Sequence, residues 1–534
     1  MPRGPKGAPA GPAGPEAGTG AGTASSGGGA PPGSGTPAPG TGTVAPAMPP
    51  APPSLGSVML PEPPGPAGRQ DSPAPAEQEA PNAFKNLFRV LRSAPPLSLE
   101  GRVTRVAGLV IEGSGPAASV GEICLVDMPG GRTLEAEAVG FKETAIQLMP
   151  IGDMTGLTPG ARIRATGGPA RVDVGPGMLG RVLDGRGRPM DGRTAFEAET
   201  SYPVRAMPGS PMDRARILSP VDVGVRCINS LLTLGRGQRV GIFAGSGVGK
   251  STLMGMIARH MKADVNVIAL VGERGREVRE FIEKDLGPEG LARSVVVAAT
   301  SEQPALVRMR GAYVGTAIAE YFRDCGKHVI LMMDSATRFA YAAREVGLSV
   351  GEPATTRGYT PSVFAMLPQL LERAGAWDSG SITGIYTVLV EGDDMNEPVA
   401  DSMRSILDGH LVLRREMAAR NIYPAVDILS SISRLMTDIT TREHRAAAAR
   451  FKDVLAVYTK NEDMINIGAY QKGASREVDE AVALYPKFVE FLKQPFDSGQ
   501  DLAASVDALM RVVSSPALPE QAQVGQADAL RRRV

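Results

Sequence analysis

The stretch AGSGVGKST, residues 244–252, lies between the apolar run RVGIF and the helical pattern LMGMIARHM. It follows the pattern GxxxxGK[ST] at Gly249, Lys250 and Ser251, although Ala244 stands where the strict pattern has its first glycine. Such a loop wraps backbone N–H groups around phosphates, while the lysine meets the β- and γ-oxygens and the hydroxyl holds Mg²⁺. A strand before the loop and a helix after it favour a P-loop over a chance glycine-rich turn. The residues expected to hold the nucleotide here are Gly245, Ser246, Gly247, Val248, Gly249, Lys250, Ser251 and Thr252.

Two carboxylates follow apolar runs further along the chain. Glu273 comes directly after VNVIALVG, and Asp334 ends HVILMMD. Open α/β sheets place their ligands at the carboxyl ends of the strands, so Glu273 is positioned to orient an attacking water and Asp334 to hold magnesium through its waters. Taken alone, Glu273 is more often a solvated loop acid. An apolar run that ends in Asp is also common, but the preceding P-loop favours the functional interpretation of Asp334.

A third segment, ARNIYPAVDILSSISRLM at 419–436, carries an aromatic and a cationic candidate. Tyr423 beside Pro424 offers a rigid plate on which an adenine can stack. Arg434 follows a serine-rich turn, and in isolation it would be an ordinary surface cation.

Composition excludes several classes of protein. The chain has 534 residues, 43% of them hydrophobic, which predicts two or three domains. It carries 57 basic and 57 acidic residues, so no net charge attracts nucleic acid or an anionic membrane. No window approaches a membrane span or an export signal, and we expect a reducing cytoplasm. The scattered cysteines and histidines argue against a disulfide framework and a metal cluster: Cys124, Cys227, Cys325, His260, His328, His410 and His444.

The N-terminal region divides into two segments. Residues 1–82 are dominated by Pro, Gly, Ala, Ser and Thr, which predicts a disordered tail, with a true start at Met48 or Met59 as the alternative. Residues 83–97 predict an amphipathic helix that docks either on a partner or on its own domain. Its apolar stripe is Phe84, Leu87, Phe88 and Leu91.

The remaining chain predicts three domains. Residues 98–195 contain short β-rich runs divided by Gly and Pro turns, which is typical of a small β-barrel. Residues 196–440 alternate buried strands with amphipathic helices, which predicts an α/β domain with a parallel sheet and helices on both faces. Residues 441–534 are expected to be helical throughout.

The run PAVDILSSIS at 424–433 resembles the signature of rotary ATPase α and β subunits, whose domain order is the barrel, α/β and helical order above. Three longer runs are similar to the type III secretion ATPases: GERGREVREFIEKDLGPEGLARS, GEPATTRGYTPSVFAMLPQLLERAG and VEGDDMNEPVADSMRSILDGH. Within that group, DDMNEPVAD resembles the flagellum-specific export ATPase more than its injectisome counterpart. The resemblance covers about residues 98–500 and implies a RecA-like P-loop core.

The resemblance also implies roles for individual residues. Lys250 and Ser251 match the family's phosphate lysine and magnesium hydroxyl, and Asp334 matches its second magnesium carboxylate. Glu273 matches the glutamate that polarises the attacking water, and Arg274 the arginine near the γ-phosphate. The cofactors implied are ATP and Mg²⁺.

Two further matches concern assembly. Tyr423 is similar to the adenine-stacking tyrosine, and Arg434 to the arginine finger that reaches into the neighbouring subunit's site. In ATP synthase the glutamate and the finger come from different chains, whereas this chain carries both Glu273 and Arg434. A closed homo-oligomer would therefore have a complete site at every interface, and by resemblance the ring is a homohexamer.

The function implied is that of an ATP-hydrolysing motor of the flagellar type III export apparatus, which couples hydrolysis to chaperone release and subunit export. Expected partners are an ATPase regulator, central-stalk-like export proteins, the export gate and chaperone–substrate complexes, with no nucleic acid. The expected location is the cytoplasm, peripheral at the inner face of the cytoplasmic membrane. Flagellar relatives begin with a short regulator-binding helix, so either 83–97 is that helix displaced inward or regulator binding differs.

Four alternatives remain. The first is the injectisome ATPase. The second is a rotary ATP synthase-type catalytic subunit, which Ser251 and GERGREV disfavour. The third is a non-hydrolysing structural subunit, which Glu273 disfavours. The fourth is a related RNA helicase, which the scarcity of aromatics in the barrel segment disfavours.

Overall fold

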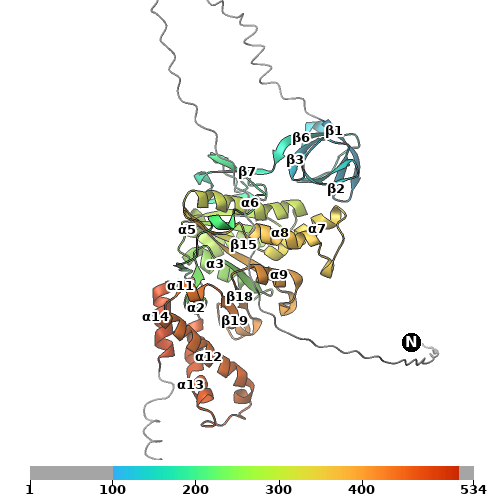
Figure 1. The fold of residues 1–534 in the computed structure, drawn as a ribbon. Coiled ribbons are helices and arrows are strands. Elements are labelled where there is room, and N and C mark those ends of the chain that lie inside the picture. Colours follow the sequence, from blue (N-terminus) through green and yellow to red (C-terminus); the bar gives the residue numbers. More distant parts are fainter. Residues whose placement is uncertain (1–99, 516–534) are drawn as a thin grey trace, which may run out of the picture. The chain divides into compact units, whose positions relative to one another are not determined.

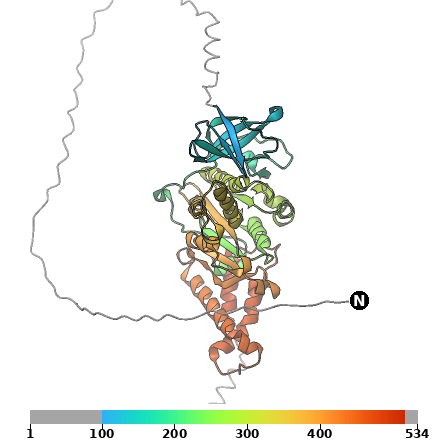
Figure 2. The same cartoon turned by 90° about the vertical axis from the view of Figure 1, so that its right-hand side faces the viewer.

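A computed structural model describes residues 100–515 of the chain. The predicted tail at 1–82 and the predicted amphipathic helix at 83–97 lie outside the described residues, as do residues 516–534 of the predicted helical domain. Figures 1 and 2 show the described part as a β domain, an α/β domain and a bundle of helices, in sequence order.

The first domain is a closed barrel of six strands in the order β1-β2-β5-β4-β3-β6. Its strands alternate between buried and less buried residues, as in β3, because successive side chains point to opposite faces of a strand. The inward side chains form the barrel's own apolar core, which includes Ile111, Val126, Leu148 and Ile163. The strands are β1 (Glu100–Ala107), β2 (Val110–Gly113), β3 (Glu122–Asp127), β4 (Thr133–Lys142), β5 (Ala145–Pro150) and β6 (Arg162–Pro169).

The barrel ends earlier than the predicted boundary at residue 195. Its last strand ends at Pro169, and β7 (Arg171–Val174) pairs with β9 (Thr200–Pro203) in a separate ribbon. The short strand β8 (Arg181–Asp184) joins the sheet of the second domain as a parallel neighbour of β14 (Ser294–Ala299). A four-residue strand between Gly and Asp turns carries the same local signals in either sheet, so the pattern assigned it to the wrong domain.

The second domain is built on a nine-stranded sheet in the order β19-β18-β12-β17-β15-β13-β14-β8, with β16 paired to β17. Apart from the pairs β18–β19 and β16–β17, its strand pairs are parallel. Its remaining strands are β12 (Arg239–Ala244), β13 (Val265–Val271), β15 (His328–Asp334), β16 (Gly375–Ala376), β17 (Ser381–Leu389), β18 (Gly409–Leu413) and β19 (Val426–Ser433). Two residues each form β10 (Pro220–Val221) and β11 (Leu234–Gly235).

Helices cover both faces of this sheet, which explains why the central strands β13 and β15 are buried at every position and mostly apolar (Figure 1). In β15, Val329, Leu331 and Met333 belong to one apolar core, and Ile330 and Met332 belong to the other. The helices are α2 (Arg226–Leu231), α3 (Lys250–His260), α4 (Gly275–Glu280), α5 (Gly287–Ala292), α6 (Ala305–Asp324), α7 (Ala336–Ser349), α8 (Pro361–Leu371), α9 (Pro398–Ile406), α10 (Arg415–Ala419) and α11 (Met436–Ile439).

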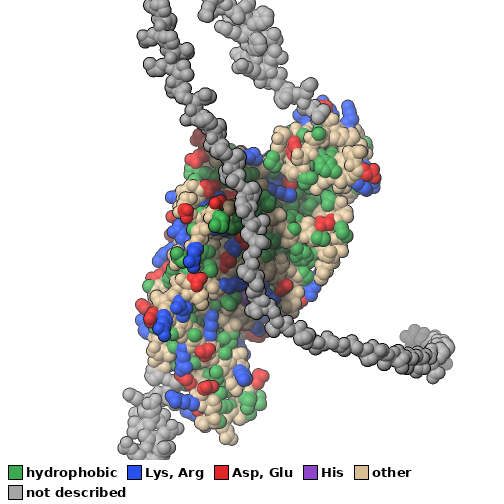
Figure 3. Space-filling model, viewed as in Figure 1, with side chains coloured by type: hydrophobic (Ala, Val, Ile, Leu, Met, Phe, Trp, Pro, Cys, Tyr) green, Lys and Arg blue, Asp and Glu red, His purple; other side chains and the backbone are tan. Residues whose placement is uncertain are grey.

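The third domain consists of α12 (Arg442–Asn466), α13 (Arg476–Leu492) and α14 (Leu502–Val513). Phe451 and Phe488 stack at 4.0 Å between α12 and α13 and join the core that also contains α2 and α3. Within residues 100–515, no helix is long and apolar enough to cross a membrane. On the face in Figure 3, basic and acidic side chains are interspersed over the described residues, in keeping with the balanced composition.

Candidate functional site: a nucleotide pocket at the strand ends

The P-loop runs from the end of β12 into the first turn of α3, as the sequence predicts. Gly247 and Gly249 have φ angles of 77° and 93°, in the left-handed region that glycine adopts without a Cβ penalty. Gly249 is the N-cap of α3, and Lys250 is its first residue. The loop therefore presents the positive end of a helix and its free N–H groups to the space in front of it.

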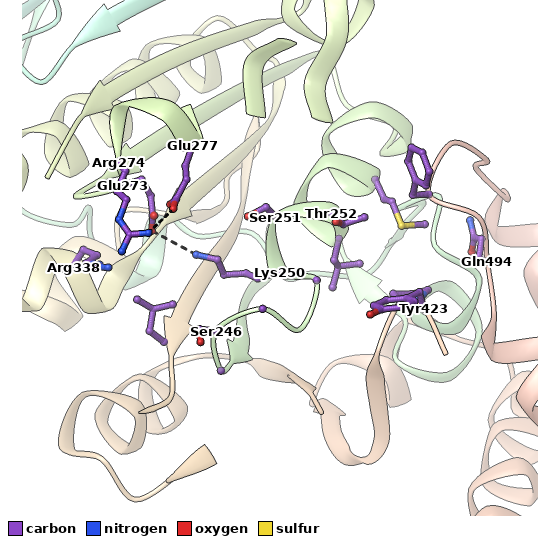
Figure 4. Close-up of a pocket in the computed structure, with 18 of the residues that line it drawn as sticks. Ser246, Lys250, Ser251, Thr252, Glu273, Arg274, Glu277, Arg338, Tyr423 and Gln494 are labelled. Atoms are coloured by element: carbon purple, nitrogen blue, oxygen red, sulfur yellow. Dashed lines mark hydrogen bonds and ion pairs between the residues drawn. The ribbon is translucent and has the colours of Figure 1, made fainter. Parts of the chain in front are cut away.

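A cavity of about 810 Å³ lies in front of this loop. This volume falls within the range of cofactor pockets. Its lining residues come from the P-loop and α3, the segment after β13 with α4, α7, the end of β17, the segment before β19 and the segment after α13. They are Gly245, Ser246, Gly247, Gly249, Lys250, Ser251, Thr252, Leu253, Met256, Glu273, Arg274, Glu277, Arg338, Leu389, Tyr423, Pro424, Gln494, Pro495 and Phe496. Figure 4 shows Lys250 near the centre of the pocket, with Tyr423 on one side. The charged side chains on the other side are Glu273, Arg274, Glu277 and Arg338. Of the predicted loop residues, Val248 does not line the cavity, because its side chain is buried in the core.

Lys250 joins the two predicted carboxylates. Its Nζ lies 2.5 Å from Oδ1 of Asp334 and 3.6 Å from Oε1 of Glu273. Burial opposes the charge of the ammonium, but Asp334 and Glu273 outweigh that effect and raise the pKa of Lys250. The lysine therefore remains a cation, as phosphate binding requires.

Glu273 follows Gly272 at the end of β13 and is largely buried, with 12% of its side chain exposed. Burial raises its pKa to about 7, with further upward contributions from Asp334 and from a hydrogen bond with Glu277, although Lys250 acts in the opposite direction. A carboxyl group with a pKa near neutrality is suited to exchange a proton with water at physiological pH. Glu273 thus lines the cavity and is largely buried, unlike a solvated loop acid, and its role toward the attacking water stays a prediction.

Asp334 ends β15 and is buried at 4% exposure, behind Lys250. Thr387 on the neighbouring strand β17 donates its hydroxyl to the same Oδ1 atom at 2.7 Å. Asp334 is not among the residues that line the cavity, and it contacts the lining through its hydrogen bond with Lys250. Its role as a magnesium carboxylate stays a prediction.

Two arginines face the phosphate end of the pocket. Arg274 is exposed and forms an ion pair with Glu277 at 3.1 Å. Arg338, in the first turn of α7, has a buried Nε atom without a hydrogen-bond partner in the described part of the chain. Gly272 permits this arrangement, because a Cβ atom there would lie 2.9 Å from Cβ of Arg338. Arg338 therefore offers a donor that an incoming anion can satisfy.

The opposite end of the pocket is aromatic. The Tyr423 side chain is 40% exposed, and its ring carbons lie within 3.6 Å of the position a Cβ would take on Gly249. The carbonyl of Tyr423 accepts a hydrogen bond from the Gln494 N–H at 2.8 Å, which fixes the segment that contains Phe496 beside it. This end fits a flat heterocycle, and the P-loop end fits its phosphates.

Arg434 lies elsewhere. It directly follows β19, is exposed, and donates from Nη2 to the carbonyl of Arg404 at 3.2 Å. It does not line the pocket of its own chain. The assignment of Arg434 as a finger for a neighbouring subunit stays a prediction.

The sequence interpretation missed Glu277, Arg338, Gln494 and Phe496. Glu277 had a usable signal, because it lies four residues after Glu273 and α4 begins at Gly275. Arg338 similarly lies four residues after Asp334. Gln494 and Phe496 follow α13 in another domain, and no local pattern connects them to the P-loop.

Comparison with protein families gives three matches along the chain. Residues 224–433 match the nucleotide-binding domain of the ATP synthase alpha/beta family, and residues 103–167 match that family's beta-barrel domain. Residues 440–511 match the C-terminal domain of the type III secretion ATPase EscN.

Individual relatives agree. The chain is 57% identical over 411 residues to a flagellum-specific ATP synthase of Bacillus subtilis, covering 77% of this chain and 94% of that one. It is 52% identical over 398 residues to a type 3 secretion system ATPase of Xanthomonas euvesicatoria, covering 74% and 90%. Its structure is similar to that of the assembled ATPase EscN of enteropathogenic E. coli, with a TM-score of 0.74 and 44% identity over 78% of this chain and all of the other. A second EscN structure, in complex with its central stalk EscO, matches with a TM-score of 0.72.

Proposed function

Because the chain belongs to the ATP synthase alpha/beta family, among the ATPases of type III secretion, we propose that it hydrolyses ATP to drive flagellar protein export. The observation that carries the chemistry is the triangle of Lys250, Glu273 and Asp334 at the ends of β12, β13 and β15. These three groups have the charges that phosphoryl transfer to water requires.

The residues of the pocket divide the work. Lys250 exchanges Asp334 for the β- and γ-phosphate oxygens when the nucleotide binds. Glu273 accepts a hydrogen bond from the attacking water and orients it toward the γ-phosphorus. Arg338 and Arg274 donate to the oxygens of the transferred group, whose negative charge moves toward the leaving oxygen.

The donor set also fits a magnesium ion. Ser251 lines the cavity, and the Asp334 carboxylate lies next to Lys250 of the same loop. Hydroxyl and carboxylate oxygens are the ligands that Mg²⁺ prefers. When bound, Mg²⁺ neutralises charge on the β- and γ-oxygens. Ser251 would hold it directly and Asp334 through its waters.

The chain acts as a homohexamer in this proposal. Glu273 lines the pocket of its own chain, whereas Arg434 is exposed outside it, so a neighbouring copy can add its Arg434 to this pocket. The EscN structures represent an assembled ATPase and its complex with a central stalk, and they support a ring with a stalk-like partner. The regulator, export gate, chaperone–substrate complexes and peripheral membrane attachment stay predictions of the family resemblance.

The test measures magnesium-dependent ATP hydrolysis against protein concentration for the wild type, Glu273→Gln, Arg434→Ala and a mixture of the two variants. Each variant alone should lose turnover by at least about 10²-fold, the contribution of a positioned base or an arginine finger. Mixed rings pair an intact Glu273 with an intact Arg434 of the neighbour, so the mixture should regain activity. A wild type that binds ATP but never turns it over would overturn the proposal.

The alternative is the injectisome branch, which the 52% identical Xanthomonas relative and the EscN structures represent. Several relatives between 48% and 57% identity are flagellum-specific, which favours the flagellar assignment. Deletion of the gene distinguishes the two, because only the flagellar assignment predicts loss of filaments with injectisome export intact.

A further inference from the structure

A second cavity, of about 200 Å³, lies where the barrel meets α6. The barrel side contributes β4, the residues just before β3 and the end of β6. The other side contributes α6 and the residues that directly follow β9. Its lining residues are Val120, Gly121, Glu137, Pro169, Ala170, Val204, Arg205, Arg310 and Tyr313. None of them lines the nucleotide pocket.

Arg310 is the unusual member of this cavity. It lies on α6, 8% of the residue is exposed, and its Nε and Nη1 atoms are buried with no hydrogen-bond partner in the described part of the chain. A guanidinium stays charged in proteins, and a buried charge without a partner is costly. Burial lowers the pKa of Arg310, because the buried environment disfavours the charged form of the side chain.

The neighbouring carboxylates already have cations of their own. Glu137, only 3% exposed, forms an ion pair with Arg205 at 3.1 Å. Glu135 pairs with both Arg186 and Arg188. Arg310 is attracted by Glu137 and Glu135, but it forms no ion pair with either of them, so its buried Nε and Nη1 atoms stay without an acceptor in the described part of the chain.

The other donors point to the same kind of ligand. The Arg205 guanidinium lies 5.5 Å from the centre of the Tyr313 ring, at the edge of the cavity. The Tyr313 hydroxyl has no hydrogen bond to residues in the range 100–515, and burial raises its pKa, so it remains a donor. Arg310, Arg205 and Tyr313 together present N–H and O–H groups, and Glu137 is the one acidic side chain among the lining residues of this cavity.

We propose that this cavity binds a small oxyanion, such as inorganic phosphate or sulfate, between Arg310, Arg205 and Tyr313. Arginine's planar fork matches two oxygens of such an ion. A water occupies about 30 Å³ in the liquid, so 200 Å³ holds a tetrahedral oxyanion with a few waters. The bound ion ties α6 to the end of the β7–β9 ribbon and to the barrel wall.

The test follows the melting temperature of the full chain against phosphate or sulfate, with chloride keeping the ionic strength constant. The parent protein for this test is Lys250→Met, which weakens phosphate binding in the nucleotide pocket, and every further variant is made in this parent. A ligand that binds only the folded state raises stability as its concentration exceeds Kd, so the parent should show a saturating rise with either oxyanion. Arg310→Met should abolish that rise in melting temperature. Without phosphate or sulfate, its melting temperature should be no lower than that of the parent, because the buried charge without an acceptor is gone.

Two further variants test whether the ligand is an anion and whether it binds at this cavity. Glu137→Gln removes the competing carboxylate, so phosphate should bind several-fold more tightly. Arg308→Met is the matched control, because this arginine of the same helix already pairs with Glu345 at 2.6 Å and its loss should leave the phosphate response intact.

Three outcomes would overturn the proposal. The first is an equal phosphate response in Arg310→Met and the parent. The second is no difference between phosphate and chloride in the parent. The third is a phosphate-independent loss of self-association in Arg310→Met, which would assign the cation to a carboxylate of a second copy. If Arg310→Met does not fold, phosphate binding by Glu137→Gln tests the proposal in its place. Phosphate affinity that is unchanged or weaker in Glu137→Gln would contradict the proposed site.

Discussion

Nζ of Lys250, the first residue of α3, lies 2.5 Å from Oδ1 of Asp334 at the end of β15. The loop before α3 follows β12, which β17 separates from β15 in the sheet. The same ammonium also lies 3.6 Å from Glu273. One lysine thus balances two largely buried carboxylates, and in the proposed mechanism it exchanges them for phosphate oxygens when the substrate binds.

This arrangement predicts that Lys250→Met destabilises the nucleotide-free protein as well as abolishing turnover. Removing one partner of a buried ion pair leaves an uncompensated charge and costs about 3 kcal/mol. The double variant Lys250→Met/Asp334→Asn should recover much of that loss, because the amide oxygen can still accept from Thr387. Urea unfolding at pH 8 measures the free energies.

The matched control is Lys284→Met. Lys284 lies 3.9 Å from Glu280 on the surface, with 69% of its side chain exposed. Exposed pairs contribute little, so its unfolding free energy should stay within about 0.5 kcal/mol of the wild type. Equal losses in Lys284→Met and Lys250→Met would contradict a special role for the buried triangle.

The raised pKa of Glu273, about 7 in the folded chain against 4.5 for a free glutamate, predicts a pH-dependent stability. Between these values the folded state holds a proton that the unfolded state has released. Stability therefore falls as pH rises from about 4.5 to 7 and then levels off. Relative to Glu273→Gln, the wild type should lose unfolding free energy over this window, measured by urea unfolding without nucleotide.

Glu277 provides the control for the pKa of Glu273. Its hydrogen bond to Glu273 contributes to the raised pKa of Glu273, so Glu277→Ala should lower that pKa. The fall in unfolding free energy should then end at a lower pH than in the wild type. The same proton controls turnover, and kcat/KM for ATP should rise with pH through about 7 as the carboxylate form appears. If the unfolding free energies of the wild type and Glu273→Gln change in parallel with pH, burial does not raise the pKa of Glu273 and this prediction is wrong.

The local parts of the site could be predicted from the sequence, and the contacts between distant strands could not. The P-loop is set by consecutive residues, since Gly247, Gly249 and Lys250 define the turn and the helix start. The position of Asp334 at a strand end is also local. That Lys250 would pair with Asp334 depends on the strand order, which no local pattern specifies.

The same limit explains the misplaced barrel boundary and the missed residues. β8 pairs with β14, more than 100 residues away, so its pattern alone did not reveal its sheet. Phe496 reaches the nucleotide pocket from beyond α13, because Gln494 bonds to the carbonyl of Tyr423. Such contacts follow from tertiary packing, which acts after the local propensities that a sequence pattern reports.

Arg338 should discriminate ATP from ADP. Its buried Nε has no hydrogen-bond partner in the described chain, so a γ-phosphate oxygen would satisfy it. A hydrogen bond to a charged group contributes about 1.5–3 kcal/mol, so Arg338→Gln should weaken binding of a non-hydrolysable ATP analogue by about 10- to 150-fold. Binding of ADP should change much less, and calorimetry measures both.

The control for this prediction is Arg276→Gln, an exposed arginine of α4 that does not line the pocket. It should leave both affinities unchanged apart from a small effect of net charge. If Arg338→Gln weakens ADP and the ATP analogue equally, this arginine supports the fold of the pocket and does not contact the γ-phosphate.

Tyr423 should contribute to affinity through its ring alone. A base stacked on an aromatic side chain contributes about 1–3 kcal/mol, so Tyr423→Ala should weaken binding of an ATP analogue by about 5- to 150-fold, whereas Tyr423→Phe should bind like the wild type. The backbone hydrogen bond from Gln494 to the carbonyl of residue 423 is independent of the side chain and should persist. Tripolyphosphate, which has no base, separates stacking from damage to the loop: its affinity should be the same for the wild type and Tyr423→Ala. An equal loss for tripolyphosphate and the ATP analogue would mean that Tyr423 acts by packing near Gly249, and the adenine would then have to lie elsewhere.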